Sequence, residues 1–305
     1  MLLVALAGVL VVLPATARAA DGPTTLTVVT FNLFHGGPFS GLTGNDGDLE
    51  RRLQMTVEHL RALDPDIVGL QEASISRRRG DVAARLAQAL GLHHVHAPTT
   101  RRVLGSPLLG RILVWLLDFD EGPAILSRFP IVESEIYDLP RCFRRLDPRV
   151  VLRAAVATPA GPLQIFSTHT SRAECQVQRV GEIVAAHQGP LPAVLTADFN
   201  LPPEANAITA LAARGLVDAF GAANPGVPGP TVFQQIRAVA PTVTRRVDYV
   251  LVLPGTERAP VVRGSRVILD IPRRLDGGGH LWPSDHHGVA AALALGLTPA
   301  HRAGR

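Results

Sequence analysis

The sequence predicts a mixed domain, α/β or α+β, in which helices cover one mixed sheet or two packed sheets. Strand-like and helix-like segments alternate in the first third of the chain, and strand-like segments separated by Pro and Gly dominate from Ala124 onward. Hydrophobic residues make up 47% and charged residues 18% of the 305 residues, which favours a packed core over disorder. We find no internal repeat and no linker, and we predict one domain over residues 21–305.

The N-terminal segment has the pattern of a secretory signal. An apolar run from Leu2 to Leu13 is followed by Pro14 and by the small-x-small sequence Ala17-Arg18-Ala19. We predict a signal peptide at residues 1–20; since no basic residue precedes the run, an uncleaved N-terminal anchor is the alternative. In both cases we expect a secreted or extracytoplasmic protein, in which Cys142 and Cys175 would form a disulfide more often than remain thiols.

The first third of the chain is predicted to alternate between strand and helix. The β-branched run from Thr25 to Phe31 indicates a strand. Leu53, Val57 and Leu60 recur at helical spacing, which predicts a helix that ends at Asp64-Pro65. The segments expected here are a Gly-rich loop at His35 to Asp48, the helix at Leu49 to Leu63, a buried strand at Ile67 to Leu70, and a helix at Asp81 to Leu90 closed by Gly91.

The rest of the chain is predicted to be rich in strands. Ser171 and Glu174 have the spacing of a capping box, which predicts a helix that runs to about His187. A second helix is expected at Glu204 to Ala213 and a loop at Asn224 to Pro230. The strands expected are Ala124 to Leu126, Ile131 to Tyr137, Val150 to Ala157, Leu163 to Thr168, Ala193 to Ala197, Val247 to Leu253, Arg263 to Asp270 and Gly288 to Leu295.

Polar side chains stand at the ends of several predicted strands. Strand ends that meet at one edge of a sheet are where catalytic groups collect in layered proteins. Carboxylate and amide oxygens suit Mg²⁺, Mn²⁺ or Ca²⁺, and a carboxylate beside a histidine can orient it. Each residue alone is more often a turn or a helix cap, so the joint pattern carries the prediction. The residues are Asn32, Glu72, His169, Asp198, Asn200, Asp248, Asp285 and His286.

Seven segments resemble the endonuclease/exonuclease/phosphatase superfamily, which includes DNase I-like nucleases and sphingomyelinase-type phospholipases. They follow the family's order and cover nearly all of the chain after the N-terminal segment, so that together they are highly specific. The segments are TFNLFHGG at Thr30, DPDIVGLQEA at Asp64, GPAILSRFPI at Gly122, FSTHTS at Phe166, LTADFNLPP at Leu195, RVDYVLV at Arg246 and SDHHGVAAAL at Ser284.

The resemblance implies a DNase I-like, four-layer α/β/β/α sandwich of two packed mixed sheets, with the site at one end. It implies a metal-dependent hydrolase in which water attacks phosphorus directly, without a covalent enzyme intermediate. Glu72 matches the main metal ligand, and Asn32 and Asp285 match residues near the metal. The other matches are Asp198 for activation of water, Asn200 for phosphate contact, His286 for the transition state with Asp248 as its orienting partner, and His169 for phosphate contact or help to the leaving group.

Three residues leave alternatives open. His287 is a second candidate for the histidine of the last motif, but the register favours His286 because it directly follows Ser-Asp. Tyr137 is the nearest candidate for a tyrosine that some nucleases carry near the phosphate. Arg153 either reaches the phosphate or forms a salt bridge on its strand.

The substrate is not determined by these motifs. We expect a phosphodiester, either nucleic acid or a phospholipid head group; the alternatives are a phosphomonoesterase of the inositol-phosphate type and a binding protein that kept the fold without catalysis. The net charge of +4 comes entirely from arginine, which suits phosphate but also reflects composition bias. Aromatic residues are scarce at 5%, which disfavours a base-stacking platform. We expect a monomer.

Two further features bear on the substrate. The apolar segment Leu108 to Leu117 is either a buried element of the sandwich, a lid, or a peripheral membrane contact with Trp115 as its anchor. Arginine clusters would support a nuclease if they gathered on one face. These clusters are Arg77 to Arg79, Arg101-Arg102, Arg144-Arg145, Arg245-Arg246 and Arg273-Arg274.

Overall fold

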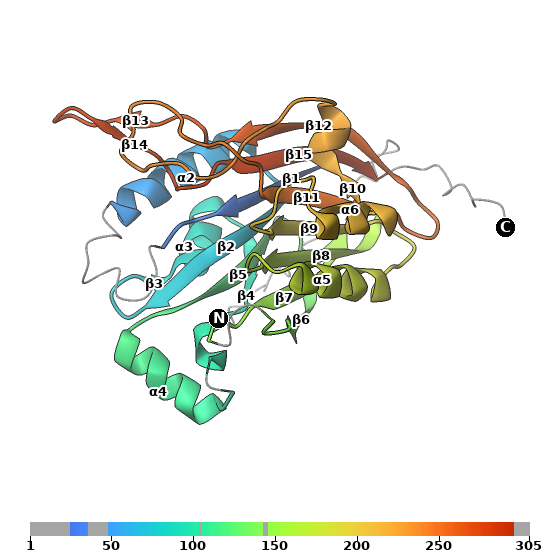
Figure 1. Cartoon of the computed structure of the whole chain (residues 1–305), viewed down its shortest axis with the longest axis horizontal. Coiled ribbons are helices and arrows are strands. Elements are labelled where there is room, and N and C mark those ends of the chain that lie inside the picture. The colour runs from blue at the N-terminus through green and yellow to red at the C-terminus, as the bar shows by residue number, and fades with distance from the viewer. Residues whose placement is uncertain (1–24, 36–47, 104, 143–145, 296–305) are drawn as a thin grey trace, which may run out of the picture.

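Two β-sheets pack face to face, with helices on the outer face of each (Figure 1). The structure is a computed structural model that describes residues 25–35, 48–103, 105–142 and 146–295. This arrangement confirms the predicted sandwich of two packed mixed sheets. The predicted signal peptide, most of the Gly-rich loop before Asp48, and the Arg144-Arg145 cluster lie outside the described residues.

The first sheet has the strand order β12-β15-β1-β2-β5-β4, with β3 beside β2. Its strands β1 and β2 run parallel, and the other pairs are antiparallel. The strands are β1 (Thr25–Asn32), β2 (Ile67–Ser76), β3 (Gly80–Asp81), β4 (His93–His96), β5 (Asp120–Ser127), β12 (Pro260–Ile268) and β15 (Gly288–Leu295).

The second sheet has the order β10-β11-β9-β8-β7-β6, in which β8 and β9 are parallel. Its strands are β6 (Ile131–Asp138), β7 (Val150–Thr158), β8 (Gly161–His169), β9 (Ala193–Asp198), β10 (Val217–Asp218) and β11 (Asp248–Leu253). A separate hairpin pairs β13 (Arg273–Arg274) with β14 (His280–Leu281).

Three apolar clusters hold the layers together. One lies between the two sheets, a second joins the first sheet to α2 (Leu49–Leu63) and α3 (Val82–Leu90), and a third joins the second sheet to α5 (Glu174–Ala186) and α6 (Asn206–Ala213). The sheets approach closely at Gly69, where a Cβ atom would lie 1.8 Å from Oγ1 of Thr196. Any larger residue at position 69 would therefore push the sheets apart.

The sequence predicts the caps of α3 correctly but not the start of α5. The α3 helix is capped as expected, because Asp81 accepts a hydrogen bond from the backbone of Ala84 at 3.1 Å and Gly91 ends the helix with a φ of 69°. The capping box predicted at Ser171 is wrong. Its hydroxyl donates to Asp147 at 2.8 Å, and α5 begins only at Glu174 without a side-chain cap.

Several short elements were not predicted. The strands β3, β4, β10, β13 and β14 have two to four residues each, too few for a periodic pattern to show. Two small helices are also new, η1 (Thr100–Arg102) and α7 (Ala219–Ala223). The segment Leu108 to Leu117 forms α4 (Pro107–Leu117), which projects from the sandwich and exposes its apolar side chains (Figure 1). The interpretation of this segment as a buried element is therefore wrong.

Cys142 and Cys175 form a disulfide, with their Cα atoms 6.8 Å apart. The bond joins the segment before β7 to the first turn of α5, as the pairing expected from the sequence requires. Among the helices in the described ranges, none combines the length and the apolar character that crossing a membrane would require.

Candidate active site

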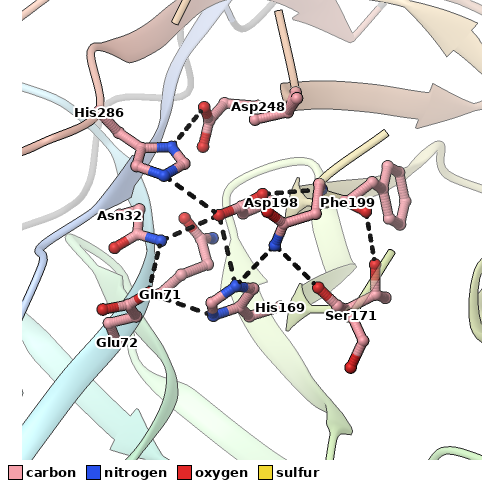
Figure 2. Close-up of polar contacts among 12 residues, drawn as sticks. Asn32, Gln71, Glu72, His169, Ser171, Asp198, Phe199, Asp248 and His286 are labelled. Atoms are coloured by element: carbon pink, nitrogen blue, oxygen red, sulfur yellow. Dashed lines mark hydrogen bonds and ion pairs between the residues drawn. The ribbon is translucent and has the colours of Figure 1, made fainter. Parts of the chain in front are cut away.

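The strand registers bring the predicted polar residues to one end of the sandwich. In the first sheet, Asn32 at the end of β1 pairs with Gln71 of the parallel strand β2, next to Glu72. In the second sheet, Asp198 at the end of β9 lies between its partners His169 and Asp248. Because parallel strands end at the same edge, side chains that are more than 200 residues apart in the chain converge there. Figure 2 shows this convergence.

Asp198 lies at the centre of the site and is fully buried. Its Oδ2 atom is 2.9 Å from the amide nitrogen of Asn32, 3.4 Å from Nε2 of His169 and 3.7 Å from Nε2 of His286 (Figure 2). Burial raises the pKa of Asp198 to about 7. The charge of His286 lowers this pKa, and the charge of Asp248 raises it. A carboxylate of this kind can accept a proton from water near neutral pH.

His286 is held by a buried carboxylate. Its Nδ1 atom is 2.9 Å from Oδ2 of Asp248, and both side chains are almost inaccessible. Burial alone would lower the pKa of His286, but Asp248 and Asp198 raise it well above the ordinary value. The ring is therefore an imidazolium at neutral pH, with Nε2 directed toward Asp198. The neighbouring His287 instead stacks on Trp282 at 5.3 Å, as the register of the motif predicts.

Glu72 is directed into the site by an irregularity of β2. The pairing of β2 with β5 shifts register between Leu70 and Ala73, and Glu72 adopts a φ of 54°, which is rare for a residue other than glycine. Its carboxylate oxygens lie 3.2 Å from the amide nitrogen of Asn32 and 3.2 Å from Nε2 of His35. Such a strained backbone at a converging set of polar groups is typical of a functional position.

His169 and Asn200 form the side of the site nearest β8. The amide nitrogen of Asn200 is 3.0 Å from Nε2 of His169 and also donates to the carbonyl of Thr170. Burial, and after it the charge of Arg149, lowers the pKa of His169 well below its ordinary value, so the ring is neutral. An amide that donates to Nε2 leaves the proton on Nδ1, which lies 3.9 Å from Glu72.

Asp285 directly precedes His286 in the chain and is buried. Burial raises its pKa to about 7, and the charge of Glu72 contributes to this shift. Ser284 ties the segment to β1, because its hydroxyl donates to the carbonyl of Asn32 at 2.6 Å. All eight predicted residues are thus part of one connected cluster.

Three charged residues of the cluster were not predicted. His35 lies 2.7 Å from Glu121 and 3.2 Å from Glu72, so it bridges the two carboxylates. Arg149 pairs with Asp147 at 2.9 Å; burial alone would lower its pKa, but Glu121, Asp147 and Glu72 raise it. His35 stands three residues after Asn32 in the first matched segment and Arg149 directly precedes β7, which are the only sequence signals for them.

The alternatives left open for two residues are resolved. Arg153 pairs with Glu133 at 3.1 Å, as a strand salt bridge, and lies within β7, four residues after Arg149. Tyr137 is on the edge strand β6, where its hydroxyl contacts Glu135 and His187. It contributes nothing to the cluster.

The cluster suits a divalent cation. The charge of Glu72 raises the pKa of Asp285. A cation between the two carboxylates would relieve this repulsion. Ligand atoms of His35, Glu72 and Glu121 lie within 4.8 Å of one another, and so do those of Asp198, Asp248 and His286. Asn32 turns its amide nitrogen toward Glu72 and Asp198 while its oxygen accepts from the backbone of Phe34, so in this arrangement it orients the carboxylates.

A family model, that of the Endonuclease/Exonuclease/phosphatase family, matches residues 29–286. The chain belongs to this family. Members of the endonuclease/exonuclease/phosphatase family are typically metal-dependent phosphoesterases and nucleases, and the acidic and histidine groups above suit that chemistry. No curated protein matches the chain.

Several solved structures have the same fold. A family protein from Bacteroides thetaiotaomicron is 20% identical with a TM-score of 0.68, and the match covers 90% of this chain and 100% of that one. The mannosyl-6-phosphatase Bt3783 of Bacteroides thetaiotaomicron VPI-5482 is 20% identical with a TM-score of 0.66, over 88% and 99% of the two chains. D. rerio TDP2 complexed with single strand DNA product is 18% identical with a TM-score of 0.63, again over 88% and 99%.

Arg149 is expected to contribute to hydrolysis at this site. Replacing it with Met is expected to lower kcat/KM for a phosphate ester by about tenfold to a hundredfold, because a guanidinium at the edge of the site, on which the charges of Glu121 and Glu72 act, can pair with the phosphate. Steady-state kinetics would measure the effect. Arg153→Met is the matched control, and an equal loss in both variants would contradict the assignment.

Arg52 of α2 positions the segments that carry Asn32 and Asp285. Its buried guanidinium donates to the carbonyls of Leu33, Phe34 and Pro283. Replacing it with Met leaves these acceptors without their donor, and we expect the free energy of unfolding to fall by about 2–4 kcal/mol in a denaturant titration. The exposed neighbour Arg51, replaced in the same way, should cost about 0.5 kcal/mol or less. Similar losses in both would show that Arg52 does not hold the site together.

Proposed function

We propose that the protein is an exported, divalent-metal-dependent phosphodiesterase. The observation that carries the proposal is the juxtaposition of a buried general base, Asp198, with the charged pair of His286 and Asp248 and with the carboxylate of Glu72. Hydrolysis of a phosphate ester needs a base that activates water, a cation that stabilises charge on the phosphoryl oxygens, and a carboxylate that binds a metal.

Glu72 and Asp285 are the residues that would hold the metal, with His35 and Glu121 close by. A divalent cation bound there, Mg²⁺ or alternatively Mn²⁺ or Ca²⁺, supplies positive charge to the phosphoryl oxygens. Asp198 accepts a proton from the attacking water, whose oxygen forms the new bond to phosphorus. Asn32 holds Asp198 through its amide nitrogen at 2.9 Å.

The remaining residues act on the phosphate. Nε2 of His286, which lies 3.7 Å from Asp198, would donate to the phosphoryl group, and as an imidazolium held by Asp248 the ring stabilises the charge of the transition state. His169 is neutral and presents its Nδ1 proton, while Asn200 orients that ring. As the P–O ester bond breaks, the leaving oxygen takes up a proton from solvent, Asp198 returns to solvent the proton that it took from the water, and both products are released.

A phosphomonoesterase is the second candidate. A similarly folded protein is named a mannosyl-6-phosphatase, whereas another is TDP2 with a single-strand DNA product, so the fold serves more than one kind of phosphate ester. A binding protein without catalysis is disfavoured because every acidic and histidine residue of the cluster is present and in contact.

One assay separates these functions. The protein is given bis(4-nitrophenyl) phosphate and 4-nitrophenyl phosphate side by side, with Mg²⁺ or Mn²⁺. Faster turnover of the diester supports the proposal, faster turnover of the monoester supports the second candidate, and failure to cleave either overturns both.

Export rests on the apolar run from Leu2 to Leu13 and on the disulfide. Recovery of the protein only from the cytoplasm of the producing cell would contradict it.

A further inference from the structure

Helix α4 is anchored in an unusual way. Its backbone approaches η1 at the buried Gly110, where a Cβ atom would lie 1.7 Å from the carbonyl oxygen of Arg101. The helix is therefore held by its glycine face rather than by its large side chains. In Figure 1 it stands away from both sheets.

The opposite face of α4 is apolar and open to solvent. Its side chains are between 46% and 68% exposed, and their spacing along the helix places them on one continuous arc. A helix that packed on the sandwich in the ordinary way would bury such an arc. The residues are Leu108, Leu109, Ile112, Trp115 and Leu116.

Arginines border this apolar arc. Arg111 lies on the flank of the helix itself and forms no ion pair within the described part of the chain. The guanidinium of Arg77 lies over the ring of Trp115, 5.9 Å from its centroid. A tryptophan and leucines beside arginines are the composition of a segment that lies in the interface of an anionic membrane.

A cavity of about 620 Å³ lies between the N-terminal part of α4 and Arg149. The described residues that line it include five arginines and one carboxylate, Asp138, which pairs with Arg102; Arg101 and Arg149 pair with Asp120 and Asp147. Arg149 lines this cavity and also borders the site, since it pairs with Asp147 at 2.9 Å and Asp147 accepts a hydrogen bond from Ser171, the neighbour of Thr170 that Asn200 contacts. The cavity therefore lies between the N-terminal part of α4, next to the apolar arc, and the edge of the active site. The arginines are Arg101, Arg102, Arg111, Arg141 and Arg149.

We propose that α4 docks on the surface of an anionic phospholipid membrane and that the arginine-lined cavity receives the phosphate of a lipid head group, which is the substrate. This inference rests on the proposed phosphoesterase function. Nucleic acid fits less well, because a polyanion would meet the exposed leucines and Trp115 next to the cavity. A lipid surface meets both features at once, with acyl chains against the arc and head groups against the arginines.

The test compares variants of the full chain on vesicles of phosphatidylcholine with and without phosphatidylglycerol. One variant carries Leu108→Gln, Ile112→Gln and Leu116→Gln, which keeps good helix formers on an exposed face. A second carries Trp115→Gln alone. The matched control carries Val239→Gln and Ile271→Gln, two side chains that are 76% and 73% exposed elsewhere. Any lipid binding by the apolar run at Leu2 to Leu13 is the same in all four proteins.

We expect the wild type and the control to sediment with the vesicles that contain phosphatidylglycerol. The triple variant should bind them at least about tenfold more weakly, and Trp115→Gln should also bind more weakly. All four proteins should hydrolyse bis(4-nitrophenyl) phosphate equally, which shows that each is folded. Failure of the wild type to bind vesicles, or equal binding by the triple variant, would overturn the inference. Binding to a DNA duplex without vesicle binding would also overturn it. Loss of diester hydrolysis by the wild type would instead count against the proposed function.

Discussion

Replacing Asp198 with Asn is expected to lower kcat for a phosphodiester by about a hundredfold or more while the protein remains folded. The amide keeps the size of the side chain and can still contact Asn32 and the backbone of Asn200, which lie 2.9 Å away. It cannot accept a proton from water, and it removes one of the three carboxylates, Asp248, Asp198 and Asp285, that raise the pKa of His286. Steady-state kinetics and a thermal unfolding curve would measure the two effects separately.

The matched control for Asp198 is Asp218→Asn. Asp218 also contacts a cation, Arg246, at 2.6 Å and caps α7, but it lies at the start of that helix and outside the cluster. Its replacement should affect stability more than kcat. A near-normal kcat for the Asp198 variant would remove Asp198 from the role of base.

The pair of Asp248 and His286 is expected to give the second large effect. His286→Gln should lower kcat by about a hundredfold, because the cation that faces the phosphoryl group is lost. Asp248→Asn should lower kcat by about tenfold to a hundredfold, as expected for a residue that orients and charges a histidine. The neighbouring His287→Gln is the control and should leave kcat close to the wild-type value, since its ring stacks on Trp282 away from Asp198.

The pH profile distinguishes a charged His286 from a merely structural one. Asp248 raises the pKa of His286, so the ring stays protonated well above its ordinary range and loses its charge only at higher pH. In Asp248→Asn this pKa falls, and the decline of kcat/KM on the alkaline side should begin at lower pH than in the wild type. An alkaline limb that does not move would show that the charge on His286 is not required.

The sequence predicted the two sheets and the convergence of the polar residues at one end of them, because both depend on local pattern. Most of the eight residues stand at or beside the ends of strands with continuous apolar runs, and such ends meet at one edge whatever the details of the connecting segments. The order of the matched segments then assigned a role to each residue. Glu72 illustrates the limit of this reasoning, since its position was predicted but the positive φ that directs its side chain was not.

Residues outside that pattern escaped prediction. Arg149 and Arg153 are alike in sequence, but β7 runs antiparallel to β8, so Arg149 lies at the site end of the strand and Arg153 lies about 13 Å further along. His35 and Glu121 come from different segments, and only the fold brings them into contact. For α4, periodicity cannot reveal which face packs; the close approach at Gly110 decides that the apolar face is the open one.

The central claim is that this cluster hydrolyses phosphate esters with the help of a divalent metal held at Glu72. The most direct test measures hydrolysis of bis(4-nitrophenyl) phosphate by the wild type after treatment with EDTA and again after addition of excess Mg²⁺ or Mn²⁺, with Glu72→Gln in parallel. We expect EDTA to abolish turnover, the metal to restore it in the wild type, and Glu72→Gln to need much more metal or to remain inactive. Full turnover in EDTA, or a Glu72→Gln variant that responds to metal as the wild type does, would contradict the claim.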